Sequence, residues 1–360
     1  MDALPDLTPI SLAGTPPELG RAHGLLLARE IRLLRRAFFR FLLRAGMLVA
    51  TWPLALLFYA LGGRFWSRVP PSLKEEMRAL AAAADLDLAS VLLINVLDDV
   101  ANALPRCSAL AVTPRASATG GVLAGRNLDY PLFLEVLLRQ QRLFRVSPAG
   151  GVPFLSVAWP GYVGVCTGMN RAGVALSQLT AMSRRTTFRG VPVALRFRLA
   201  LERGTHLSAA VREILAHPAT IGNNVLLADP AGALVLELAP GAWACRRPVA
   251  GLLTATNHFQ APEMAGLRGR FPRRPPGSPL SPGHFTFAYS VARDRRLQEL
   301  AGGRKLSPRE IMAILADPGI ANPGTVVSAV FAPAEGTLWL ARGHETPVSR
   351  HRWGEIRAPW

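Results

Sequence analysis

The sequence predicts an α+β layered sandwich built mainly from antiparallel strands, and three observations support this prediction. Half of the 360 residues are hydrophobic, which is ample for a packed core in one large domain or two small ones. Apolar residues recur at three- and four-residue spacing before residue 106, as in amphipathic helices, whereas short strand-like runs closed by Gly, Pro, Asn or Asp dominate afterwards. Pairs of helices are inserted between these runs, and this order differs from the regular alternation of a parallel α/β sheet.

The first 106 residues are predicted to be helical. Two amphipathic regions cover residues 18–43 and 72–104, and a Pro-Pro-Ser break starts the second one. The chain begins with acidic residues where a secretory signal would have a basic region, so we expect a cytoplasmic protein or one peripheral to a membrane.

An apolar segment separates the two helical regions. Residues 45–63 contain no charge, and arginines flank them on both sides. This length is just enough to span a hydrocarbon core. Pro53 and the surrounding aromatic residues equally fit a kinked hairpin in a membrane interface or over a lipid-binding groove. A buried helix of a large core is the third interpretation.

The strand-like runs start at Cys107 and continue to the end of the chain. Helices are expected at about 193–202, 208–216, 285–301 and 307–315, and a Pro-, Arg- and Gly-rich loop at about 260–283 is expected to form a surface flap. The predicted strands lie within 107–114, 121–130, 142–148, 153–161, 162–170, 173–180, 223–230, 233–240, 252–259, 325–333 and 337–343.

The charge balance is strongly positive but spread along the chain. Lys and Arg number 41 against 24 Asp and Glu, a net charge of +17, which raises nucleic acid or an anionic membrane as a partner. Only Lys74 and Lys305 are lysines, and the arginines form no dense run like those of nucleic-acid-binding arms. We therefore predict no nucleic-acid partner.

The cysteines and histidines exclude the usual metal sites. Cys107, Cys166 and Cys245 are odd in number and widely spaced, so they form neither a disulfide framework nor a CxxC site. The histidines have no metal-ligand spacing, and the phosphate-binding loops, the HExxH motif and the GxSxG motif are absent. We predict no metal and no cofactor, and we interpret Cys166 and Cys245 as core residues.

The remaining candidate site is centred on Cys107. Arg126 and Asp129, three residues apart on the strand after the hairpin, can both face Cys107 and supply a cation and a carboxylate. The cation is expected to lower the pKa of the thiol. If the chain were cut before Cys107, the freed α-amino group, with a reference pKa of about 7.7–8.0, could act as the thiol's own base, and Asp129 could hold it. The plain alternative is a small buried cysteine beside a strand-end salt bridge.

The run CSALAV at Cys107, followed by AGRNLDYP, resembles the amino-terminal-nucleophile (Ntn) hydrolases of the linear-amide group. This group includes acid ceramidase, N-acylethanolamine acid amidase, the penicillin acyltransferase family and, more distantly, choloylglycine hydrolase. Residues 16–31, 168–173, 256–259 and 325–331 resemble further pieces in the same order. The resemblance implies an αββα sandwich, a helical pro-segment of residues 1–106, a catalytic part of residues 107–360, and self-cleavage between Arg106 and Cys107, after which the two chains stay associated.

The resemblance also implies a role for each matched residue. Cys107 would be the nucleophile and, through its new amine, the base, while Arg126 and Asp129 would orient thiol and amine. Asn257 would offer its amide to the oxyanion, as a preorganised donor does.

Two further site residues are less sharply placed by the resemblance. Asn170 matches a second polar residue near the oxyanion site of the bile-salt branch. Arg293 is our choice for the late arginine of the family, with Arg270, Arg295 and Arg296 as alternatives.

The function implied is hydrolysis of a linear amide of an N-acyl substrate through a cysteine thioester. The segment 45–63 and the positive charge favour a long-chain fatty-acyl amide delivered from a bilayer. The alternatives are an acyltransferase of the penicillin type, a bile-salt-type hydrolase, and an inactive membrane-associated protein.

Overall fold

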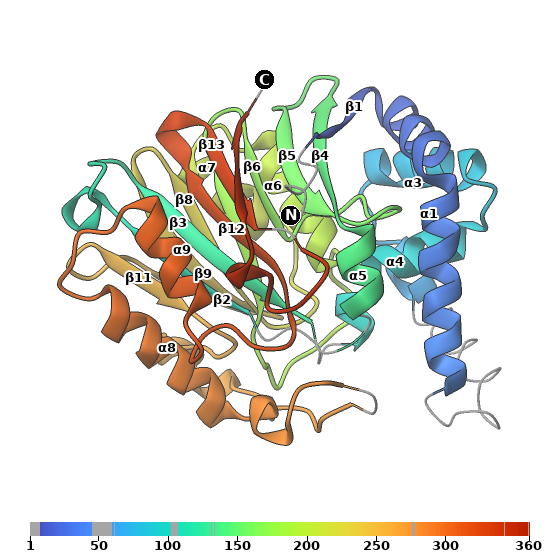
Figure 1. Cartoon of the computed structure of the whole chain (residues 1–360). Coiled ribbons are helices and arrows are strands. Elements are labelled where there is room, and N and C mark those ends of the chain that lie inside the picture. The colour runs from blue at the N-terminus through green and yellow to red at the C-terminus, as the bar shows by residue number, and fades with distance from the viewer. Residues whose placement is uncertain are drawn as a thin grey trace.

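Two stacked β-sheets form the centre of the protein, and helices cover both outer faces (Figure 1). The structure, a computed structural model, describes residues 8–44, 60, 62–101, 107–130, 132, 134–275, 278–341, 343–358 and 360. Arg106 and most of the apolar segment 45–63 lie outside these residues. Among the described residues, no helix is long and apolar enough to cross a membrane.

The larger sheet has eight strands, and the smaller has six. The order of the larger one is β1 (Ile10–Gly14), β4 (Arg142–Pro148), β5 (Phe154–Ala158), β6 (Thr167–Asn170), β7 (Ala175–Thr180), β8 (Asn223–Asp229), β9 (Gly232–Ala239), β10 (Ala242–Arg246). The order of the smaller one is β11 (Leu252–Ala255), β2 (Ser108–Val112), β3 (Leu123–Asp129), β12 (Thr325–Ala332), β13 (Thr337–Ala341), β14 (Trp353–Arg357). Neighbouring strands are antiparallel except β1 and β4.

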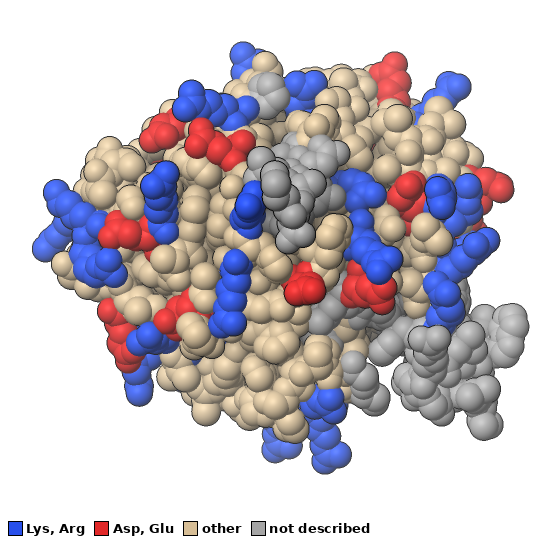
Figure 2. Space-filling model, viewed as in Figure 1, with Lys and Arg blue, Asp and Glu red and all other residues tan. Residues whose placement is uncertain are grey.

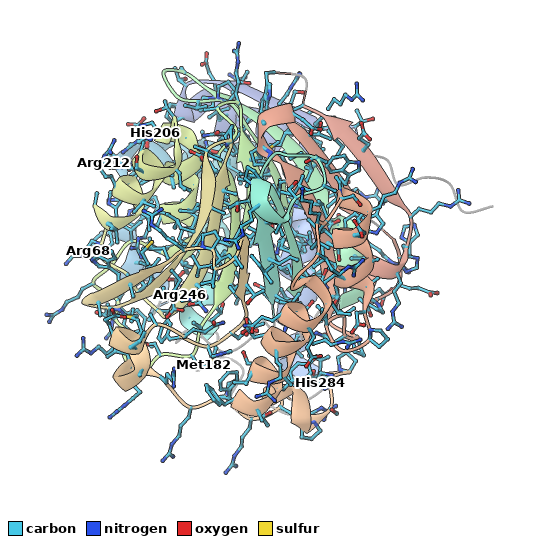
Figure 3. The ribbon with its side chains drawn as sticks, turned by 90° about the vertical axis from the view of Figure 1, so that its left-hand side faces the viewer. Arg68, Met182, His206, Arg212, Arg246 and His284 are labelled. Atoms are coloured by element: carbon cyan, nitrogen blue, oxygen red, sulfur yellow. The ribbon has the colours of Figure 1, made fainter. Side chains whose placement is uncertain are left out.

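Three apolar layers hold the sandwich together. One lies between the two sheets, one lies under α8 (Phe287–Ala301) and α9 (Pro308–Ala316), and the largest joins the eight-stranded sheet to the other helices except α5, which packs against the layer between the sheets. In the view turned by 90°, His206 and Arg212 of the α7 side and His284 of the α8 side lie on opposite sides of the sheets (Figure 3). The other helices are α1 (Pro16–Arg44), α3 (Pro71–Ala83), α4 (Leu88–Ala101), α5 (Leu134–Gln140), α6 (Val193–Arg203) and α7 (Leu207–Leu215).

The predicted αββα sandwich is confirmed, with local corrections. The N-terminal region is not purely helical, because β1 adds a parallel edge strand beside β4. The short elements α5, β10 and β14 were not expected from the sequence. Residues 260–283 include two short 3-10 helices and bury Met264 and Leu280, so this segment is more than an exposed flap. Cys166 is buried as predicted, but Cys245 is exposed, because it lies on the edge strand β10.

The surface charges are scattered. Figure 2 shows Lys and Arg side chains distributed over the viewed face with Asp and Glu side chains between them, and they do not gather into one basic patch there. Ion pairs such as Arg296 with Asp317 and Arg304 with Glu310 partly neutralise the excess locally.

Buried polar contacts attach the N-terminal helices to the eight-stranded sheet and α6. Glu76 of α3 pairs with Arg198 of α6 at 3.3 Å, and both side chains are almost fully buried. Asn95 of α4 accepts from the backbone of Val163 at 2.8 Å, and His23 of α1 accepts from the backbone of Gly161 at 2.9 Å. Burial lowers the pKa of His23 to about 3, so its imidazole is the neutral acceptor that this contact needs.

Helices α1 and α3 touch through their backbones, which allows a first prediction. A Cβ added at Gly20 would lie 2.0 Å from the carbonyl oxygen of Glu76. This oxygen belongs to the backbone of α3, which can move away only at a cost in stability. We expect Gly20→Ala to lower the free energy of unfolding by about 1–3 kcal/mol, as overpacking does. Gly63→Ala is the control, because this helical glycine has nothing within 4 Å of its would-be Cβ. Urea unfolding of the full chain measures both, and equal effects would contradict the close packing.

Candidate active site

The site forms where several strands of the six-stranded sheet end together. Strand β2 runs antiparallel to both β3 and β11, so its first residue lies beside the last residues of these two strands. Cys107 directly precedes β2, Asp129 ends β3, and Asn257 follows β11. Thr325, the first residue of β12, is paired with Asp129. The strand register therefore gathers residues that are up to about two hundred positions apart in the chain.

Arg126 lies on the thiol side of Cys107. Alternate residues of a strand point to opposite faces, and both side chains are directed into the space between the two sheets. The guanidinium crosses this space: Nη1 donates to the carbonyl oxygen of Cys166 at 3.0 Å and also to the hydroxyl of Thr167 on β6. Both Cys107 and Arg126 are completely buried. The eight-stranded sheet thus fixes the cation next to the thiol.

Arg293 and Asp129 lie on the main-chain side of Cys107. Arg293 Nη1 donates to the carbonyl oxygen of Cys107 at 3.0 Å and is 3.5 Å from Asp129 Oδ2. Its Nη2 donates to Asn257 Oδ1 at 2.7 Å. Asp129 Oδ2 also accepts from the side chain of Asn322 at 2.7 Å, whereas the buried Oδ1 has no hydrogen-bond partner among the described residues. A buried acceptor is thus left beside the residue whose amine would be released by cleavage.

Burial dominates the acid–base chemistry of the uncut chain. Desolvation raises the pKa of the Cys107 thiol, although Arg126 opposes this and a backbone hydrogen bond from Asp129 also lowers it. The expected lowering by Arg126 is therefore present but is outweighed. Burial also raises the pKa of Asp129 to about 6, against the opposing charge of Arg293. In this state the thiol is held protonated.

The loop after β11 fixes the orientation of Asn257. Because Arg293 holds Oδ1, the amide nitrogen Nδ2 is directed to β7, where it donates to the carbonyl oxygen of Thr180 at 2.7 Å. The adjacent His258 is mostly buried; its Nδ1 lies 2.9 Å from the hydroxyl of Ser290 on α8, and burial lowers its pKa to about 4. His258 is thus a neutral side chain that anchors the loop to α8.

Comparison with known proteins agrees with the motifs. Residues 117–276 match the family model described as acyl-coenzyme A:6-aminopenicillanic acid acyl-transferase. The predicted resemblance is confirmed. This match contains Arg126, Asp129, Asn170 and Asn257 and begins after Cys107. An uncharacterized protein of Archaeoglobus fulgidus is 28% identical over 232 residues, which are 56% of this chain and only 38% of that relative's length.

Solved structures of Ntn hydrolases are also similar to the chain. The N-acylethanolamine-hydrolyzing acid amidase ortholog of Caenorhabditis elegans is 18% identical, with a TM-score of 0.47, over 63% of this chain and 93% of that one. A variant of conjugated bile acid hydrolase from Clostridium perfringens is 15% identical, with a TM-score of 0.45, over 69% and 92%. Penicillin V acylase from Agrobacterium tumefaciens is 16% identical, with a TM-score of 0.39, over 66% and 83%.

Asn170 does not join the other residues of the Ntn-type site. Its Nδ2 donates to the carbonyl oxygens of Leu201 and Gly204, at the end of α6, and its Oδ1 accepts from the backbone of Val174 at 2.9 Å. These contacts lie on the helix-covered face of the larger sheet and in the β6–β7 turn. The sequence-based placement of Asn170 at the site is therefore corrected: this residue anchors α6 to the sheet.

A group of polar residues close to the site was not predicted from the sequence. The hydroxyl of Tyr130, the residue after Asp129, donates to Asp98 Oδ1 of α4, and the hydroxyl of Tyr162 lies 3.1 Å from the sulfur of Cys166. Tyr130 belongs to the RNLDYP motif, which was the one available signal. Asp98 lies in α4, shortly before Cys107 in the sequence, but nothing in its own pattern indicated a place in the site.

A cavity of about 110 Å³ begins at this group of polar residues. Its walls come from α1, α4, α5 and the loop before β6, and they are mostly aliphatic or aromatic. Its lining residues are Leu34, Arg35, Ala37, Ser90, Leu93, Ile94, Leu97, Asp98, Tyr130, Val136, Leu137, Trp159 and Tyr162. The cavity thus lies between the N-terminal helices and the part of the chain after Cys107, and it reaches Tyr130, the residue next to Asp129.

Proposed function

We propose that the protein is a self-activating cysteine Ntn amidohydrolase that cleaves N-acyl amides, with a fatty-acyl group as the acyl part. The observation that carries the proposal is the arrangement around Cys107: Arg126 on the thiol side, and Arg293 with Asp129 on the main-chain side. This separation suits a residue that uses its sulfur as nucleophile and its own amine as base.

Maturation follows from this arrangement. The sulfur of Cys107 attacks the carbonyl carbon of Arg106, the peptide bond to the Cys107 nitrogen breaks, and water hydrolyses the resulting thioester. The new ammonium then has Asp129 Oδ1 as an acceptor, so that this buried oxygen gains a partner. Its positive charge also favours the ionised form of Asp129 and of the thiol.

Turnover uses the same groups. The thiolate of Cys107 attacks the substrate amide, the α-ammonium protonates the departing amine, and a thioester remains. Water, activated by the now neutral amine, releases the carboxylic acid. Asn257, held by Arg293, is proposed as an oxyanion donor, which requires its Nδ2 to exchange the carbonyl of Thr180 for the substrate.

The two chains are proposed to stay associated after the cut. The pro-segment shares a continuous apolar core with the larger sheet and α6, and buried pairs such as Glu76 with Arg198 cross between the two parts. Breaking such a buried pair is strongly unfavourable because it leaves an uncompensated charge.

The cavity supports an apolar acyl group. Its walls are mostly hydrocarbon, as in ligand pockets that bind by apolar burial with few polar groups. We further propose that the segment 45–63 contacts a membrane surface from which a long-chain amide is delivered.

A substrate panel tests this function, as a second prediction. Protein whose cleavage has been verified by mass is incubated with an N-acylethanolamine, a ceramide, penicillin V and a conjugated bile acid, each offered in micelles and in vesicles. We expect release of the fatty acid from the first two, and a thioester on the chain that starts at Cys107 in acid-quenched samples. No product from any fatty-acyl amide would refute the assignment.

Acyl transfer is the second candidate, because the matched family model is described as an acyl-transferase. The same thioester would pass its acyl group to an amine or thiol in place of water. Adding 6-aminopenicillanic acid to the assay distinguishes the two, since a transferase forms the new amide faster than the free acid.

A further inference from the structure

A free carboxylate oxygen faces the apolar cavity behind the site. Asp98 is only 8% exposed and belongs to the cavity lining. Its Oδ1 accepts from the hydroxyl of Tyr130, and no hydrogen bond to Oδ2 occurs among the described residues. This oxygen is therefore available to accept a hydrogen bond from an occupant of the cavity that supplies a donor.

We propose that Asp98 is the polar end of a subsite in this cavity and that its Oδ2 accepts a hydrogen bond from the hydroxyl group of a hydroxylated aliphatic chain. The leucine and isoleucine side chains of α1 and α4 would contact the hydrocarbon part, and Asp98 would select the substituted chain. The assignment of this chain to the acyl part of the substrate rests on the proposed function; the binding itself does not.

The surroundings favour a neutral hydroxyl over an ammonium group. Burial raises the pKa of Asp98, so its charged form is disfavoured. The guanidinium of Arg35 also lines the cavity, held by Asp87 at 3.3 Å, and it would repel a cation. A hydroxyl can donate to the carboxylate or accept from the carboxylic acid, so it fits either form of Asp98.

The position of Asp98 also indicates where the hydroxyl should be. Tyr130 directly follows Asp129, and its hydroxyl reaches Asp98, so the carboxylate is one tyrosine side chain away from the site. A chain whose carbonyl is at Cys107 would therefore meet Asp98 only after it has passed the length of this side chain. We expect an acyl group with a hydroxyl near the middle of its chain to fit best.

A binding experiment tests the subsite without catalysis. Full-length Cys107→Ala protein is titrated calorimetrically with N-ethyldecanamide and with its 3-hydroxy, 6-hydroxy and 6-amino derivatives. We expect the 6-hydroxy amide to bind about tenfold more tightly than the plain amide, a typical gain for one buried hydrogen bond. Equal affinities, absence of binding, or preference for the 6-amino derivative would overturn the proposal.

Variants on the same background locate the preference. Asp98→Leu should abolish the preference for the hydroxylated amide while the plain amide still binds. Asp98→Asn keeps an acceptor oxygen and should retain part of this preference. Glu299→Gln is the control, because this exposed carboxylate of α8 is not part of the cavity lining, and it should leave the preference for the hydroxylated amide unchanged. If Asp98→Leu does not fold, Tyr130→Phe serves instead, because it frees the carboxylate and should preserve or increase the preference. A preference that survives Asp98→Leu would place the hydroxyl elsewhere and overturn the proposal.

Catalysis is then measured separately. If the hydroxylated chain binds through Asp98 but mature protein hydrolyses no N-acyl amide, the subsite stands and the proposed function fails. If amides are hydrolysed with no effect of the hydroxyl on kcat/KM or on binding, the function stands and the subsite fails.

Discussion

Cys107→Ala is expected to remain a single uncut chain and to lose amidase activity by about 10⁴-fold or more, as loss of a covalent nucleophile does. Arg126, Asp129 and Arg293, which surround Cys107, carry no thiol and therefore cannot form the thioester in its place. The measurement is intact mass and N-terminal sequencing after incubation between pH 4.5 and 8. Wild-type protein should give a second chain that begins CSALAV.

The other cysteines provide matched controls. Cys166→Ala removes a buried thiol that contacts the hydroxyl of Tyr162, and Cys245→Ala removes an exposed one. Both variants should still be cut. A wild-type chain that stays whole at every pH would refute self-maturation and favour the inactive, membrane-associated alternative.

The layered fold and half of the site could be predicted because their signals are local. Alternating strand patterns closed by turn residues gave the β2–β3 hairpin, and this hairpin alone brings Arg126 and Asp129 to Cys107. Asn257 was predicted from the resemblance of residues 256–259 to the family and not from the strand pattern. Strand β1 was missed because it is five residues long, and its stability comes from pairing with β4 rather than from its own pattern.

Arg293 illustrates a signal that was present but not used. Ser290, Leu297 and Ala301 are buried along α8, and a residue at position 293 falls on the same helical face. Arg295 and Arg296 are outside this buried set, and the side chain of Arg296 is 42% exposed and pairs with Asp317. Helical periodicity would therefore have favoured Arg293 over the two other arginines of α8.

Asn170 and Asp98 could not be placed by sequence. Asn170 follows a glycine and a methionine in a strand turn. Its residue type does not reveal whether its side-chain amide binds a ligand or donates to the carbonyl oxygens at the end of α6. Asp98 lies in a run with Asp99, and one carboxylate lines the cavity while the other caps α6 through the backbone of Val193. Only the tertiary packing of α4 separates their roles.

Arg293→Met is expected to prevent cleavage and to lower the free energy of unfolding by about 3–5 kcal/mol, as the loss of one partner from a buried ion pair does. The arginine is completely buried, and its guanidinium carbon lies 4.7 Å from the centre of the Tyr289 ring. Without it, Asp129 loses its cation, and the carbonyl oxygen of Cys107 and Oδ1 of Asn257 each lose a donor. Arg293→Lys keeps the charge but not the two-pronged geometry, so it should be intermediate.

The pH dependence of this variant separates the ion pair from simple packing. The pKa of Asp129 in the folded protein is about 6, above its ordinary value of 3.8, so the folded state binds the proton more tightly than the unfolded state. The resulting contribution to stability is fully present below about pH 4 and is lost as the pH rises through about 6. Arg293 is the largest factor that lowers this pKa, so its removal raises the pKa further. The variant therefore continues to lose stability at pH values where the wild type no longer does. In urea unfolding, the free energy of unfolding of Arg293→Met should therefore be further below that of the wild type at pH 7.5 than at pH 5. Arg296→Met, one turn away on the surface, should cost about 0–1 kcal/mol at either pH, and a pH-independent deficit in Arg293→Met would show that the ion pair with Asp129 does not hold the site.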